Sequence, residues 1–223
     1  MNTLPVDLRA RLAADYAPVR PLAAPWVRAL WCAPFALLAL VAAPAYFSVR
    51  SDAAQLGWLA WGASLTQVLL GFMVMTAALR DSVPGRSWSR AAAGSWIAMP
   101  IALAIALTFG SWLLSPIDLR GAHLKVWVLC LAGSASTALP LVALGTILVA
   151  RAYPTRPLLA GALVGLGAGL MADAGWRMFC HFSEPWHVLP AHLGGVVVSM
   201  LAGMLLSIRL KADAAIRPET PSR

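Results

Sequence analysis

Residues 158–179 read LLAGALVGLGAGLMADAGWRMF, an apolar stretch that holds one acidic and one basic residue. A helix needs about 20 mostly apolar residues to cross roughly 30 Å of hydrocarbon, so this stretch predicts a membrane-spanning helix. Gly161, Gly165 and Gly169 recur every four residues along it. Such a row of small residues lets the backbone of a neighbouring helix come close. We therefore expect a helix that packs tightly inside a bundle, with these glycines at the contact.

Other stretches of the chain share this apolar character. Hydrophobic residues make up 60% of the sequence and charged residues 12%, whereas a soluble domain carries about 25% charged residues. Only helices and closed barrels satisfy backbone polar groups in lipid, and none of the stretches alternates like a barrel strand. We predict an all-α membrane protein, a bundle of six transmembrane helices spanning residues 29–209, with cytoplasmic segments 1–28 and 210–223. The six stretches are Ala29–Val49, Leu56–Leu79, Ala92–Leu114, Val126–Ala150, Leu158–Phe179 and Val188–Ile208.

The distribution of Lys and Arg predicts the topology. Cytoplasmic loops carry an excess of these residues. On that rule both termini lie in the cytoplasm, and the chain is a multi-pass protein of a bacterial inner membrane. The net charge of +8 then reflects topology, and we expect contact with the lipid bilayer and no direct contact with nucleic acid. The residues assigned to the inner side are Arg9, Arg11, Arg20, Arg28, Arg80, Arg86, Arg90, Arg151, Arg156, Arg209, Lys211, Arg217 and Arg223, against Arg50, Arg120, Lys125 and Arg177 outside.

The N-terminal segment has a pattern of its own. Leu4, Leu8 and Leu12 recur at helical spacing within residues 3–16, and prolines then break the helix before the membrane. This amphipathic helix could lie on the inner leaflet of the membrane. It could also dock into a groove of a cytoplasmic partner.

Ligand-type side chains gather between the last two apolar stretches. The run Cys180-His181-Phe182-Ser183-Glu184-Pro185-Trp186-His187, with His192 beyond it, holds three of the four histidines. Topology places this run on the outer side, and it puts Cys130 at a similar depth. Thiolates with imidazoles suit zinc, copper or a similar metal, and two thiols in an oxidising compartment can also form a disulfide. Two cysteines that only pack within apolar helices would give the same pattern, and so would histidines in a solvated polar turn. The candidate signal-sensing or metal residues are Cys130, Cys180, His181, Glu184, His187 and His192.

Two further observations concern charge and chemistry. Asp173 and Arg177 are one helical turn apart, and an ion pair between them would offset the cost of an acidic group in the membrane. The sequence contains no nucleophile elbow, HExxH or phosphate-binding glycine loop, so we do not expect an enzyme. A small membrane protein that handles metal or haem, or a transporter subunit, stays open as an alternative.

The chain resembles the NrsF-like family of membrane anti-sigma factors. The resemblance rests on Ala17-Pro18-Val19-Arg20-Pro21-Leu22, on the six apolar stretches, on Cys130, and on Cys180-His181 after a glycine-rich helix. It implies an inner-membrane protein that holds an extracytoplasmic-function sigma factor inactive and releases it on a stress signal, a metal or an oxidant, at the outer cysteines. No permanent cofactor is implied, only a transient heavy-metal or transition-metal ion there. The residues implied to bind the sigma factor are Leu4, Leu8, Leu12, Val19 and Arg20.

Overall fold

The computed structural model describes residues 21–114 and 122–216, together with Ala10. Within these residues every regular element is a helix, and no strand occurs. The predicted docking helix, Val19 and Arg20 fall outside the described residues, apart from Ala10. The helices are α2 (Pro25–Leu30), α3 (Ala33–Phe47), α4 (Ala53–Leu56), α5 (Trp58–Asp81), α6 (Arg90–Leu113), α7 (Leu124–Ala150), α8 (Pro157–Phe179), α9 (Pro185–Val188), the π-helical turn η1 (Leu189–Leu193) and α10 (Gly194–Ile216).

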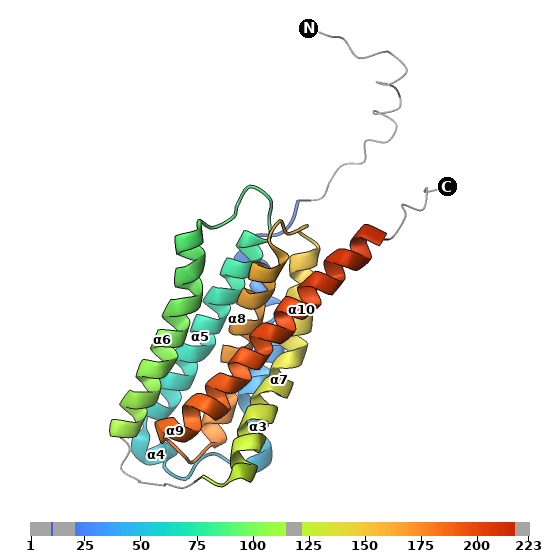
Figure 1. Cartoon of the computed structure of the whole chain (residues 1–223). Coiled ribbons are helices and arrows are strands. Elements are labelled where there is room, and N and C mark those ends of the chain that lie inside the picture. Colours follow the sequence, from blue (N-terminus) through green and yellow to red (C-terminus); the bar gives the residue numbers. More distant parts are fainter. Residues whose placement is uncertain (1–9, 11–20, 115–121, 217–223) are drawn as a thin grey trace.

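Among the described residues, six spans are long and apolar enough to cross a membrane, as the sequence predicted. Their ends differ from the predicted ones by a few residues. The first span joins α2 to α3 and the last joins α9, η1 and α10, while α5, α6, α7 and α8 each form a span alone. Helix α10 continues to Ile216, beyond the end that hydropathy suggests for the membrane segment. Figure 1 shows that the start of α2 and the end of α10 lie at the same end of the bundle, and that α9 lies at the opposite end.

Helix α8 is the central element of the bundle. It packs against α3, α5, α7 and α10, and in Figure 1 it lies behind α10, between α5 and α7. In the most apolar stretch of α8, 89% of the residues are buried, compared with 22% in that of α6. The bundle is therefore organised around one helix that is apolar or small on all sides.

Small residues set the spacing between α8 and its neighbours. A Cβ added to Gly161 or Gly165 would collide with backbone atoms of α10, at Gly203 and Ser199 respectively. One added to Gly169 would lie 2.9 Å from Val196 Cα. The predicted glycine row thus lies at the contact with α10. Gly175 lies against the backbone of α3 at Ala39 and Leu40, so α8 approaches two helices closely.

Buried polar contacts tie the helix ends together at the end of the bundle where α2 begins. Arg28 is buried and donates to the carbonyl oxygens of Leu79 and Leu148, in the last turns of α5 and α7. A guanidinium there satisfies carbonyls that lack a partner within their own helix. Nearby, Arg156 pairs with Asp81, whose carboxylate also accepts from the Trp88 backbone amide at 2.8 Å. These contacts fix the loops around that end.

We expect Gly165→Ala to destabilise the protein, because the new methyl group would overlap the α10 backbone. Overpacking of this kind costs about 1–3 kcal/mol. Gly94→Ala is the matched control, since a Cβ there meets no atom within 4 Å, and replacing a helical glycine by alanine normally favours the helix by about 0.5–1 kcal/mol. Thermal unfolding of the detergent-solubilised chain should show a lower midpoint for Gly165→Ala only. Equal midpoints for the two variants would contradict the close α8–α10 contact.

Candidate functional site

Two thiols from different helices meet at the end of the bundle opposite the α2 start. Cys130 belongs to the second turn of α7, and Cys180 directly follows α8. Their sulfur atoms are 3.8 Å apart, both side chains are buried, and both thiols are free. Together with Ala191 they form a small apolar cluster that is separate from the main core. The packing of α7 on α8 therefore brings these two cysteines together.

Two histidines join the thiols. His187 Nε2 lies 3.3 Å from Cys180 Sγ. One ligand atom from each of Cys130, Cys180, His187 and His192 lies within 4.8 Å of all the others, and all four residues are buried. We call this set the thiol–imidazole cluster.

The π-helical turn explains how both histidines reach the cluster. His187 and His192 are five residues apart, and in an α-helix with 3.6 residues per turn such residues diverge. His187 belongs to α9 and His192 to the wider turn η1 that follows it, and i→i+5 bonding there brings positions five apart closer to the same side. Their rings are 5.6 Å apart, edge to face. The sequence showed both histidines but gave no spacing rule that would pair them.

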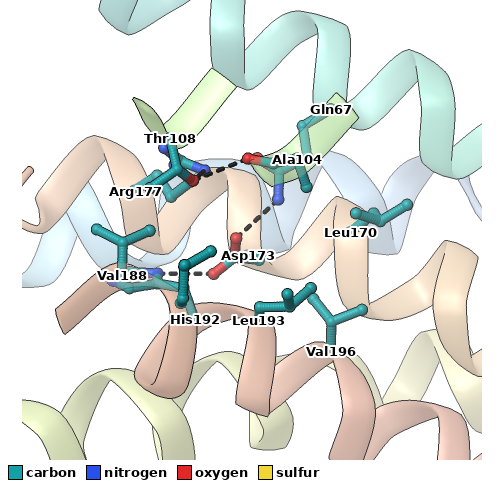
Figure 2. Close-up of a pocket in the computed structure, with 11 residues that line it drawn as sticks. Gln67, Ala104, Thr108, Leu170, Asp173, Arg177, Val188, His192, Leu193 and Val196 are labelled. Carbon is teal, nitrogen blue, oxygen red and sulfur yellow. Dashed lines mark hydrogen bonds and ion pairs between the residues drawn. The ribbon is translucent and has the colours of Figure 1, made fainter. Parts of the chain in front are cut away.

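A chain of hydrogen bonds holds the His192 ring through its Nδ1 atom. His192 Nδ1 lies 2.7 Å from Asp173 Oδ1, and Gln67 Nε2 donates to Asp173 Oδ2 at 2.7 Å. Figure 2 shows Asp173 between these two partners. These hydrogen bonds join α5, α8 and η1. Gln67 was not predicted as a site residue, because its partner lies on another helix and no local pattern in the sequence connects the two.

The expected ion pair between Asp173 and Arg177 is not formed. Arg177 donates instead to Thr108 Oγ1 on α6 at 3.1 Å (Figure 2). The two residues share a face of α8, but both oxygens of the carboxylate are already bound by Gln67 and His192. Partners from other helices therefore replace the local one.

His181 and Glu184 lie outside the thiol–imidazole cluster. The His181 ring packs edge-on against Phe179, with centroids 6.3 Å apart. Glu184 precedes α9, and its carboxylate accepts from the Ala122 amide at 3.4 Å. Both belong to the non-helical connection between Cys180 and α9, whereas the cluster draws its histidines from α9 and η1. Cys32 packs in the main core, away from the other thiols, as expected.

The surroundings of Cys180 favour its thiolate. The thiol of Cys130 donates to Cys180 Sγ, and this bond, followed by the one with His187, holds the pKa of Cys180 well below its ordinary value although burial opposes ionisation. Arg50 and Arg177 line a small cavity together with Cys180 and His192. Arg50 also donates to Ser183 at 2.7 Å, which ties the connection after α8 to the end of the first span. A thiolate is the form of cysteine that binds metals and attacks other sulfur atoms.

The fold and the site together define a small six-helix bundle of membrane-crossing length with a buried thiol–imidazole cluster near one end. The family model described as "Negative regulator of sigma F" (NrsF) matches residues 12–211, and the chain belongs to that family. Membership confirms the resemblance seen in the sequence and makes the chain a negative regulator of a sigma factor. No curated protein and no solved structure matches the chain.

We expect mild oxidation with diamide, in the presence of a chelator, to join Cys130 to Cys180 and to leave Cys32 reduced. Each disulfide formed transfers two electrons and two protons to one diamide, and the two sulfurs need to approach only from 3.8 Å to about 2.05 Å. Alkylation followed by peptide mass spectrometry reads the pairing. The Cys32→Ser variant should give the same result. Persistent alkylation of both Cys130 and Cys180 after oxidation would contradict the observed proximity.

Proposed function

We propose that this chain is an inner-membrane anti-sigma factor. It holds an extracytoplasmic-function sigma factor through its N-terminal segment and releases it when a metal ion or an oxidant reaches Cys130 and Cys180. Membership of the NrsF family supports the sigma factor as partner. The observation that carries the sensing role is the meeting of two buried thiols from α7 and α8, 3.8 Å apart, at the end of the bundle away from the α2 start.

Charge supports the proposed orientation. Arg80, Arg86, Arg90, Arg151 and Arg156 belong to the ends and loops on the same side of the bundle as the start of α2. The positive-inside rule places that side in the cytoplasm. The segment with Leu4, Leu8, Leu12, Val19 and Arg20 then faces the cytoplasmic sigma factor, and the thiols face outward.

The energy that such a switch needs is small. A signal changes the bundle only by binding one conformation better than the other. A tenfold change in the released fraction needs about 1.4 kcal/mol of differential affinity. A new bond to the paired thiols can supply this, because it constrains α7 relative to α8, and α8 also packs against α3, α5 and α10.

Deletion of residues 1–20 should release the sigma factor. In a strain with a reporter driven by a promoter of that sigma factor, the truncated chain should give the same high expression as deletion of the whole gene. Removal of residues 217–223, which belong to the same predicted compartment, serves as the matched control and should leave repression intact. Immunoblots of membranes check that each variant accumulates. Full repression by a normally accumulating N-terminal truncation would refute the assigned binding segment.

Cys130→Ser combined with Cys180→Ser should keep repression but abolish induction. Serine is nearly the same size as cysteine but binds soft metals poorly and forms no disulfide. The same reporter, measured before and after addition of Cd²⁺ or diamide, should stay at its uninduced level in the double variant. Cys32→Ser should respond like the natural chain. Normal induction of the double variant would show that the two thiols are not needed to detect the signal.

A further inference from the structure

We infer that His187 and His192 complete, with Cys130 and Cys180, a four-coordinate Cys₂His₂ centre for a tetrahedral divalent ion of the zinc class. This inference rests on the proposed function in one respect, because it names the chemical nature of the signal that the thiols receive. It adds two ligands and a supporting carboxylate to the cysteine pair.

The distances within the cluster fit a metal of this kind. A tetrahedral zinc ion with Zn–S bonds of about 2.3 Å and Zn–N bonds of about 2.0 Å holds two sulfurs about 3.8 Å apart and a sulfur and a nitrogen about 3.5 Å apart. The Cys130 and Cys180 sulfurs are 3.8 Å apart, and Cys180 Sγ lies 3.3 Å from His187 Nε2. All four ligand atoms lie within 4.8 Å of one another. A small contraction around an ion is sufficient to form the centre.

His192 carries the clearest sign of an unused ligand atom. Its side chain is 1% exposed, and its Nε2 has no hydrogen-bond partner among the described residues. Nδ1 is paired with Asp173, which orients the ring and, when Nδ1 carries the proton, leaves Nε2 as a lone-pair donor. An imidazole that binds a metal through one nitrogen while a carboxylate holds the other is the usual arrangement in zinc proteins.

Gln67 and Asp173 act as positioning residues for this ring. Gln67 fixes the second oxygen of Asp173 from α5, so the orientation of His192 depends on contacts that reach across the bundle (Figure 2). A polar group buried in an apolar bundle costs free energy unless it is hydrogen-bonded. In the chain Gln67–Asp173–His192 both carboxylate oxygens of Asp173 have partners, and the buried His192 Nε2 has none among the described residues, which leaves it available for an ion.

The donor set selects the class of ion. Two sulfurs and two nitrogens, without a carboxylate oxygen among the converging atoms, suit Zn²⁺, Cd²⁺ or Co²⁺, whereas Mg²⁺ and Ca²⁺ require oxygen ligands. Two thiolates also neutralise a divalent charge, which matters in a buried site. Arg50 and Arg177 border the same small cavity as Cys180 and His192. The centre would join α7, the end of α8, α9 and η1.

Co²⁺ titration tests the centre directly. The full chain, purified in detergent, reduced and stripped of metal with a chelator, should bind one Co²⁺ with the intense visible bands of tetrahedral cobalt and thiolate-to-cobalt bands in the near ultraviolet. His187→Gln and His192→Gln should lose the tetrahedral bands and bind at least tenfold more weakly. Asp173→Asn should weaken binding about 10–100-fold, as loss of a supporting carboxylate does. His181→Gln is the matched control and should bind normally.

A second measurement does not depend on variants that fold. X-ray absorption of the zinc-loaded natural chain should show two sulfur and two nitrogen neighbours. Absence of stoichiometric binding, or a first shell without two nitrogens, overturns the inference, as does an unchanged Co²⁺ spectrum in both histidine variants. If the chain binds no metal while the reporter still requires both cysteines, the four-ligand centre falls and the thiol switch remains. If the centre forms but the reporter ignores the thiols, the proposed function fails and the metal site stands.

Discussion

The close contact of α8 with its neighbours is the constraint on which the structure depends. At Gly161 and Gly165 the backbone of α10 occupies the space that a side chain would need, and at Gly175 the backbone of α3 does the same. Helices placed in lipid have no hydrophobic drive to associate, so close packing and buried polar contacts are what hold a bundle of such helices together. Because α8 is fixed on several sides, its C-terminal end is fixed as well. That end carries Asp173 and leads directly into Cys180.

Buried polar groups specify the packing in the half of the bundle that carries the two thiols. Ser64 donates to the Ala174 carbonyl, and Gln67 bonds to Asp173. Arg177, one turn further along the same face of α8, bonds to Thr108 on α6. Each such group would cost several kcal/mol if it were left without a partner in an apolar setting. The bonds therefore select one rotation of α5 and α6 about α8, and this rotation is the one that leaves His192 beside the thiols.

The helical architecture could be predicted from local sequence patterns, whereas the candidate site could be predicted only in part. The length of the apolar stretches predicts the six spans, because the thickness of the hydrocarbon layer fixes that length. The glycine spacing predicts a close contact with another helix, but it does not say that this helix is α10. The thiol pair depends on two helices whose cysteines are fifty positions apart, so depth in the membrane suggests it and nothing local requires it. Local spacing is misleading at Asp173, where partners from α5 and η1 replace Arg177. It is also misleading at the polar run, because the π-helical turn brings His187 and His192 together and leaves His181 and Glu184 aside.

The distance between the thiols and the N-terminal segment can be bridged by one continuous helix. Cys130 lies near the start of α7, and Leu148 lies in its last turn, where its carbonyl accepts from Arg28. Arg28 belongs to α2, which directly continues the N-terminal segment, and it also binds Leu79 at the end of α5. Helix α7 is one continuous element from Leu124 to Ala150, with Pro140 inside it, so a shift of one end along the helix axis would be carried toward the other end. A bond formed at Cys130 that moves α7 against α8 would therefore change the contact of Arg28 with Leu148 while Leu79 stays in place. The two carbonyls that hold Arg28 belong to different helices, so this residue is where relative movement of the helices would reach the segment proposed to bind the sigma factor.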